Sequence, residues 1–216
     1  MTKAVQIDFV SDVVCPWCVI GLRELETALA RLGDVVEPKI HLQPFELNPT
    51  MPREGQGIAE HMQQKFGRKM DDSSGIRQAL QARADAVGFT MTMNDDSRVY
   101  NSFDAHRLLH WAGLKGKQVA LKHALFGAYF TENLNIADPD ILVAKAESVG
   151  LDGAEAREVL SSGRYTDEVR AAEQGWMRSG INSVPSVVIN RKYLISGGQT
   201  AAVFEEGLRR IAAEGT

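Results

Sequence analysis

The two cysteines of the chain, Cys15 and Cys18, lie three positions apart where an apolar extended segment meets an amphipathic helix. Residues 5–10 are rich in Val, Ile and Phe, which predicts a buried strand. Residues 18–32 repeat apolar side chains at alternating steps of four and three, which predicts a helix with one apolar face: Cys18, Leu22, Leu25, Leu29 and Leu32. A CxxC pair between a strand and a helix favours redox chemistry.

The rest of the chain predicts an α/β fold interrupted by a long helical insertion. Residues 35–45 predict a second strand, parallel to the first through a right-handed crossover. Residues 57–180 are helical in pattern almost throughout, with Asp138-Pro139 and Asp152 as helix starts and Thr166 as a further cap. Strand character returns in the last part of the chain, followed by a closing helix: residues 184–189, 193–195 and 201–212.

These patterns predict a discontinuous α/β domain formed by residues 1–52 and 181–216. The intervening residues 53–180 are predicted to form an all-helical domain. A chain of 216 residues is long enough for a sizeable core without disulfide staples.

Charge and hydropathy exclude several classes of partner. The net charge is −4, which argues against a nucleic acid or a polybasic membrane contact. The N-terminal residues have no signal-peptide pattern, and no segment has the 18 apolar residues of a membrane span. The expected location is therefore the cytoplasm.

The dithiol is expected to react through a thiolate. If Pro16 is the first helical residue, Cys15 is the N-cap, and its sulfur lies at the positive end of the helix dipole, which favours the anion. Cys18, one turn further on, is then more enclosed. We expect Cys15 to attack a disulfide and Cys18 to resolve the mixed disulfide. Pro16 and Trp17 should tune the site, with Trp17 as an apolar platform for substrate.

Two other interpretations of the cysteine pair are disfavoured. A zinc site would need four Cys or His ligands, and none of the five histidines is near the cysteines in sequence. An incidental pair of buried cysteines explains the spacing but not its position between strand and helix.

Several short motifs follow one another along the chain. The first is Ser11–Cys18 followed by Gly21, and the others lie further along: Phe45-Glu46-Leu47-Asn48-Pro49, Asn101 with Asp104-Ala105-His106-Arg107, Leu125–Phe130, Val184-Pro185 and Ser196-Gly197-Gly198-Gln199. In this order the motifs resemble the DsbA-like family of thioredoxin-fold oxidoreductases, and most closely its FrnE-like branch, and the likeness covers nearly the whole chain. The resemblance implies a thioredoxin-like fold with an inserted helical domain, and dithiol–disulfide exchange as the activity.

The resemblance also implies roles for single residues. Val184-Pro185 would be a cis peptide opposite the dithiol, where the Val184 backbone could pair with a substrate. Family members often have Gly before this pair and Thr-Phe after it, whereas here Ser183 precedes it and Ser186-Val187 follows. The departures concern the fit of the substrate more than the chemistry.

Three polar residues are candidates of a different kind. Asp8 resembles a buried acid of DsbA-like proteins and could accept a proton from Cys18, or it could face solvent on the strand. Asp12 could accept hydrogen bonds near the helix start. His106 is expected to be a structural histidine rather than a site residue.

The leading hypothesis is a dithiol–disulfide oxidoreductase or isomerase that acts on protein or small-molecule disulfides. It needs no bound cofactor, because the cysteines carry the electrons; glutathione or a thioredoxin-type protein could recharge it. A second hypothesis is a glutathione-dependent enzyme, either a kappa-class transferase or a 2-hydroxychromene-2-carboxylate isomerase, although such proteins generally lack the full dithiol. A third is a redox-independent holdase that binds unfolded chains through an apolar surface.

Overall fold

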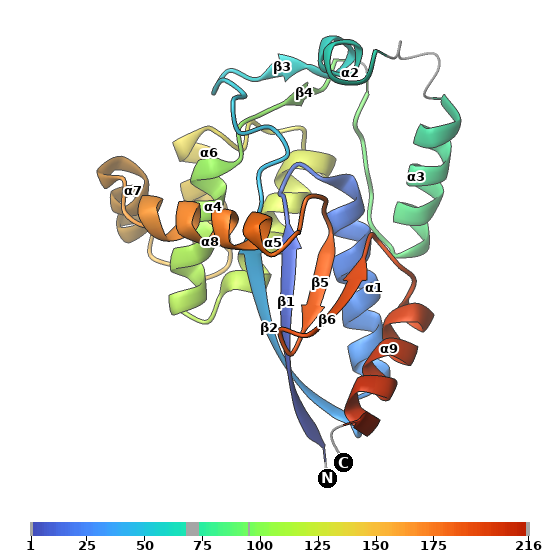
Figure 1. The fold of residues 1–216 in the computed structure, drawn as a ribbon. Coiled ribbons are helices and arrows are strands. Elements are labelled where there is room, and N and C mark those ends of the chain that lie inside the picture. Colours follow the sequence, from blue (N-terminus) through green and yellow to red (C-terminus); the bar gives the residue numbers. More distant parts are fainter. Residues whose placement is uncertain (1, 68–73, 95, 215–216) are drawn as a thin grey trace.

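A central sheet of four strands organises the molecule in the computed structural model, which describes residues 2–67, 74–94 and 96–214 (Figure 1). The strand order is β2-β1-β5-β6. β1 pairs in parallel with β2 and antiparallel with β5, which pairs antiparallel with β6. The strands are β1 (Lys3–Ser11), β2 (Val36–Pro44), β5 (Ser186–Ile189) and β6 (Tyr193–Ser196). This confirms the predicted α/β fold and the parallel first pair.

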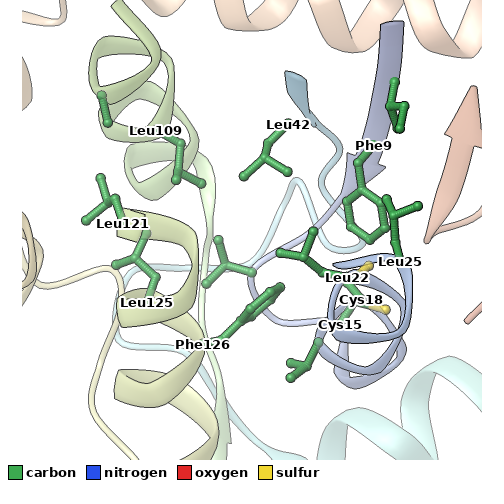
Figure 2. Packing of buried hydrophobic residues seen from close by; sticks show 14 of the residues in the cluster. Phe9, Cys15, Cys18, Leu22, Leu25, Leu42, Leu109, Leu121, Leu125 and Phe126 are labelled. Carbon is green, nitrogen blue, oxygen red and sulfur yellow. The ribbon is translucent and has the colours of Figure 1, made fainter. Parts of the chain in front are cut away.

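Helix α1 (Pro16–Arg31) leaves the end of β1 and packs beside the C-terminal helix α9 (Ala201–Glu214) on one side of the sheet (Figure 1). Its apolar stripe enters the core, where Leu22 and Leu25 lie close to Phe9 of β1 (Figure 2). The apolar repeat in the sequence therefore fixes which side of α1 faces inward, and with it the direction of the two sulfur atoms at its start.

The residues between β2 and β5 are mainly helical, as predicted. The helices are α2 (Ile58–Phe66), α3 (Ser74–Ala86), α4 (Phe103–Leu114), α5 (Gln118–Phe126), the π-helical turn η2 (Gly127–Thr131), α6 (Pro139–Ser148), α7 (Gly153–Ser162) and α8 (Thr166–Arg178). Two short strands that the sequence pattern did not predict, β3 (Gln56–Gly57) and β4 (Arg98–Val99), pair with each other. A two-residue strand is too short to produce a periodic signal.

The helix starts follow the predicted caps at two of three positions. Asp138 accepts a hydrogen bond from the Asp140 N–H at the start of α6, and Asp152 accepts one from the Glu155 N–H at the start of α7. The prediction of Thr166 as a cap was wrong. Thr166 is already helical, and its hydroxyl donates back to the carbonyl oxygen of Gly163.

The insertion does not pack as one block against the sheet. Helices α4, α5 and α8 contact β2, whereas α3 lies beside α1 (Figure 1). The predicted boundaries at residues 52 and 181 stay a prediction, and residues 68–73 and 95 within that interval lie outside the described residues. In the described part of the chain, no helix combines the length and apolar character that a membrane crossing requires.

Replacing Leu25 with Ala should destabilise the fold strongly. Leu25 is fully buried between α1 and the sheet, so the substitution leaves a cavity and should cost roughly 2–5 kcal/mol of unfolding free energy. The measurement is urea denaturation followed by circular dichroism. Leu114→Ala is the matched control: this side chain is 65% exposed and its loss should cost less than about 0.5 kcal/mol. Equal losses in the two variants would contradict the packing described here.

Candidate active site at the start of helix α1

Cys15 is the N-cap of α1, and Pro16 occupies the first helical position. The backbone of Cys15 is extended, with φ −94° and ψ 112°, and its carbonyl accepts a hydrogen bond from Cys18 N at 3.0 Å. Both thiols are free; Cys15 is 4% exposed and Cys18 is fully buried. The predicted positions are therefore confirmed: Cys15 is the N-cap, Pro16 is the first helical residue, and Cys18 is the more enclosed of the two cysteines.

Val184 lies against Cys15, although the two are 169 positions apart in the sequence. The Val184–Pro185 peptide bond is cis, and the Cys15 Sγ donates to the Val184 carbonyl oxygen at 3.7 Å. Gly21 makes this approach possible: a Cβ atom there would lie 3.1 Å from the Pro185 Cγ. A larger residue at position 21 would push the Pro185 loop away from α1.

The two serines that depart from the family pattern bond to each other. The Ser186 hydroxyl donates to the Ser183 carbonyl oxygen at 2.9 Å, across the two residues of the cis peptide. Ser186 is buried. The two serines are therefore joined by a hydrogen bond that spans the cis peptide, next to the Val184 carbonyl that faces Cys15.

Trp17 is half-buried at the tip of α1, in contact with the turn that follows β6. A Cβ atom on Gly198 would lie 3.0 Å from the Trp17 carbonyl oxygen, so only glycine fits at that position without displacement. Arg83 of α3 completes this corner. Its guanidinium lies 5.9 Å from the centre of the Trp17 ring, donates to the Gly198 carbonyl at 2.9 Å, and lies 3.5 Å from Glu24 of α1.

The sequence did not identify Arg83 as a site residue. A helical pattern does not show which arginine on the polar face of a helix contacts a neighbouring helix or loop. Its contacts explain why α3 lies beside α1. They also give the Trp17 ring a cationic neighbour.

Asp12, in the loop between β1 and α1, is fully buried and holds that loop in place. Its carboxylate accepts hydrogen bonds from Val14 N at 3.3 Å and Leu47 N at 2.7 Å, and His106 Nε2 of α4 lies 3.4 Å away. Burial by itself would raise the pKa of Asp12, but His106 and the Leu47 N–H outweigh it and hold the pKa below its ordinary value. Asp12 thus accepts hydrogen bonds near the helix start, as expected. His106, which was expected to be a structural residue, lies against the loop that contains Asp12.

Asp8 is buried, but it is not brought to the dithiol. Successive side chains of a strand point to opposite faces, and the neighbouring Phe9 points toward Cys18 and α1 (Figure 2). The Asp8 carboxylate accepts instead from the amides of Gln6 at 2.8 Å and Gln43 at 2.7 Å. This placement does not support the predicted transfer of a proton from Cys18 to Asp8, nor the alternative of a solvent-facing residue.

Cys18 lies in an environment that opposes its ionisation. Burial is the largest cause that raises the pKa of Cys18 well above its ordinary value, followed by the neighbouring Cys15 thiol. The buried Lys122 of α5 acts in the opposite direction. Reaction of Cys18 as a thiolate therefore requires a group that compensates for the lost hydration.

The other residues of the helical-domain motif have structural contacts. The Arg107 guanidinium is buried and donates to the carbonyl oxygens of Val159 at 2.7 Å and Leu160 at 3.0 Å, near the end of α7. Asn101 accepts from Phe103 N at the start of α4 and donates to the Met51 carbonyl. Among the described residues, no group of three or more His, Cys, Asp or Glu side chains could hold a metal ion.

A sheet of this topology with a CxxC pair at the first turn of α1, facing a cis-proline loop, defines a thioredoxin-like redox fold. The model of the DSBA-like thioredoxin domain matches residues 6–209. The chain belongs to this family.

Individual proteins and solved structures are similar to this chain. The crystal structure of a probable DsbA oxidoreductase from Streptomyces coelicolor is 32% identical, with a TM-score of 0.92 over 98% of this chain and 92% of that one. The uncharacterised protein YwbO of Bacillus subtilis (strain 168) is 29% identical over 94% of this chain and 96% of its own. A 2-hydroxychromene-2-carboxylate isomerase structure shares the fold at 16% identity and a TM-score of 0.74, with 97% of both chains covered.

Replacing Asp12 with Asn should destabilise the folded protein in a pH-dependent way. The variant loses the charged acceptor of two backbone N–H groups and the partner of His106, a cost of roughly 1–3 kcal/mol at neutral pH. Because the folded pKa of Asp12 is depressed, its stabilisation is fully present above the ordinary value of 3.8 and is lost as the pH falls through the lower folded value.

The measurement is the free energy of unfolding of both proteins from neutral to acidic pH. The difference between them should shrink only below about pH 4. Asp34→Asn, at an exposed position, is the control and should show no such difference. A difference that stays constant down to the acid limit would contradict the ionised, buried Asp12.

Proposed function

We propose that the chain is a dithiol–disulfide oxidoreductase whose redox centre is Cys15-Pro16-Trp17-Cys18. The Cys15 thiolate attacks one sulfur of a substrate disulfide, forms a mixed disulfide and releases the other substrate sulfur as a thiolate. The Cys18 thiolate then attacks the Cys15 sulfur, forms the Cys15–Cys18 disulfide and releases the second substrate thiolate. Two electrons pass from the dithiol to the substrate, and the reverse sequence oxidises a substrate dithiol.

The observation that carries this proposal is the placement of two free thiols at the first turn of α1, with Cys15 3.7 Å from the Val184 carbonyl. Cys15, the outer cysteine, lies at the helix end whose backbone N–H groups have no partner within the helix. Val184 provides backbone atoms for an extended substrate, and Trp17 provides an apolar surface beside it. Family membership supports thiol–disulfide chemistry in general.

The proposal needs no bound cofactor, because the dithiol itself carries the electrons. A protein or small-molecule disulfide is the substrate class, and glutathione or a thioredoxin-type partner would restore the starting state. The cytoplasmic location and the FrnE-like branch stay predictions. Isomerase activity would follow from the same site if Cys15 attacked a wrong disulfide and the substrate itself resolved it.

Substitution of each cysteine by Ser tests the proposal, because the two are expected to fail at different steps. Cys15→Ser should abolish insulin reduction and exchange with glutathione disulfide, because no attacking sulfur is left. Cys18→Ser should keep the first step and accumulate the mixed disulfide, detected by intact-protein mass spectrometry. Ser161→Ala, at an exposed position far along the chain, is the control for effects of purification and should keep full activity. Full exchange activity in Cys15→Ser would overturn the proposal.

The same variants separate the competing hypotheses. Saturable glutathione binding that survives Cys18→Ser, with turnover of a chromene carboxylate, would favour the glutathione-dependent enzyme. Suppression of aggregation that survives loss of both cysteines would favour the holdase. Equilibration with glutathione buffers gives the redox potential of the Cys15–Cys18 pair. A potential well above that of the cytosolic glutathione pool would indicate an oxidant or isomerase, and a potential near that of thioredoxin would indicate a reductase.

A further inference from the structure

The guanidinium of Arg83, on α3, is fixed by its neighbours and still partly exposed. Its Nη2 donates to the Gly198 carbonyl oxygen at 2.9 Å and lies 3.5 Å from the Glu24 carboxylate. The Cζ atom lies 5.9 Å from the centre of the Trp17 ring. Both polar contacts use Nη2, and within the described part of the chain Nε and Nη1 make no hydrogen bond or ion pair. Because 34% of the side chain is exposed, Arg83 keeps donors that a solute can reach.

The turn Gly197-Gly198, which Arg83 contacts, is bonded to the loop that faces the dithiol. The N–H of the first glycine of the turn donates to the Pro185 carbonyl oxygen at 2.8 Å. On the other side of the cis peptide, the Val184 carbonyl oxygen accepts from the Cys15 Sγ at 3.7 Å. Arg83 therefore borders the cis-proline loop from the side of α3, while Cys15 borders it from the start of α1.

Glu24 of α1 does not belong to Arg83 alone, because its carboxylate has a second partner. One oxygen, Oε1, lies 3.5 Å from the Arg83 Nη2, and the other, Oε2, accepts from Ala201 N at 2.8 Å. Ala201 is the first residue of α9, so this oxygen faces the positive end of that helix dipole. The negative charge of Glu24 is thus divided between a guanidinium and a helix start, and it compensates Arg83 only in part.

Arg23 adds a second positive charge between α1 and α3, which lie side by side (Figure 1). It contacts a carbonyl and a ring rather than a carboxylate: Nη1 donates to the Val87 carbonyl oxygen at 3.3 Å, and Cζ lies 5.2 Å from the centre of the Phe89 ring. Asp85, the acidic residue of α3, accepts from Gln81 of its own helix. The junction of α1 and α3 therefore carries a local positive charge, although the net charge of the chain is −4.

We propose that Arg83 binds a carboxylate of the substrate, so that the protein prefers disulfides that carry a carboxylate close to their sulfur atoms. The inference rests on the proposed function. A guanidinium keeps its charge at every accessible pH, and the donors on Nε and Nη1 can form charge-assisted hydrogen bonds with carboxylate oxygens. The contacts of Nη2 orient the group before the substrate arrives, which lowers the entropy lost on binding. Arg83 then holds the substrate while Cys15 attacks, and it takes no part in the transfer of electrons.

A substrate contact differs from a purely structural role in what it does to different substrates. The bond to Gly198 and the ion pair with Glu24 hold α3 against α1 whatever the substrate is. If these were the whole function of Arg83, its loss would change the reaction of every disulfide by the same factor. A contact with a carboxylate instead separates substrates by their charge, because attraction to a guanidinium changes sign with the charge of the ligand.

Three small disulfides of similar size test the inference at neutral pH: hydroxyethyl disulfide is neutral, the disulfide of mercaptopropionate is anionic, and cystamine is cationic. The reduced protein is mixed with each, quenched with acid, and the formation of the Cys15–Cys18 disulfide is followed by mass spectrometry. Each rate is divided by the rate of dithiothreitol with the same disulfide, which removes differences in intrinsic reactivity. On this scale we expect the anionic disulfide to react about threefold to tenfold faster than the neutral one, and cystamine to react more slowly.

Arg83→Gln should remove most of this preference, and Arg83→Lys, which keeps the charge, should retain more of it. Arg31→Gln is the matched control: Arg31 pairs with Glu205 of α9 at 3.7 Å near the other end of α1, and its loss should leave the ratios unchanged. An Arg83→Gln variant that slows all three disulfides equally, or none of them, would overturn the inference and leave the proposed function intact. Failure of the unaltered protein to react with any of the three would instead overturn the proposed function.

The salt dependence of the unaltered protein keeps the inference testable if Arg83→Gln does not fold. The net charge of the chain is −4, so the overall field alone would favour cystamine at low salt. A contact at Arg83 predicts the opposite order, and added salt should reduce the advantage of the anionic disulfide because it shortens the screening length. A preference for cystamine at low salt, or equal normalised rates at every salt concentration, would overturn the inference.

Discussion

The first turn of α1 is held on three sides, and the chemistry of the dithiol depends on that confinement. Beneath it, Phe9 and Leu22 fix the apolar side of the helix against the sheet. Before it, the buried Asp12 binds the backbone of the loop that turns from strand to helix. Opposite it, Pro185 packs on Gly21, where a Cβ atom would lie only 3.1 Å from the Pro185 Cγ. These three contacts together hold the Cys15 sulfur near the Val184 carbonyl.

The same confinement places the two cysteines in different surroundings. Cys15 is the N-cap, so its sulfur is at the end of the helix where the backbone N–H groups are unpaired. Cys18 is one turn inside and fully buried, and burial raises the pKa of its thiol. In the proposed reaction this difference assigns the attack to Cys15 and the resolution of the mixed disulfide to Cys18.

Much of this arrangement could be predicted from local sequence patterns. The spacing of Leu22, Leu25 and Leu29 determined α1 and its inner face, and Pro16 determined where the helix begins. The same reasoning failed for Asp8, because both faces of β1 are buried in this fold and polarity no longer indicates the direction of a side chain. It could not find Arg83, whose contacts with Trp17 and Gly198 exist only after α3 has packed on α1.

Lys122 is an intermediate case, since the sequence did contain a signal. The residue is three and four positions before Leu125 and Phe126, so it lies on the face of α5 that enters the core. A lysine on such a face can also extend its ammonium group to the surface. The packing of α5 against α4, α6 and β2 shows that this side chain is enclosed.

The helical insertion therefore contributes to the interior that surrounds the dithiol. Through α4 it places His106 against Asp12, and through α5 it adds Phe126 to the apolar cluster and buries Lys122. A thioredoxin-like core without an insertion would leave this space to water or to its own helices. Here one of the charges that act on Cys18, that of Lys122, comes from a residue about 100 positions further along the chain. Changes in the insertion can thus alter the electrostatic environment of Cys18 while the Cys15-Pro16-Trp17-Cys18 segment stays the same.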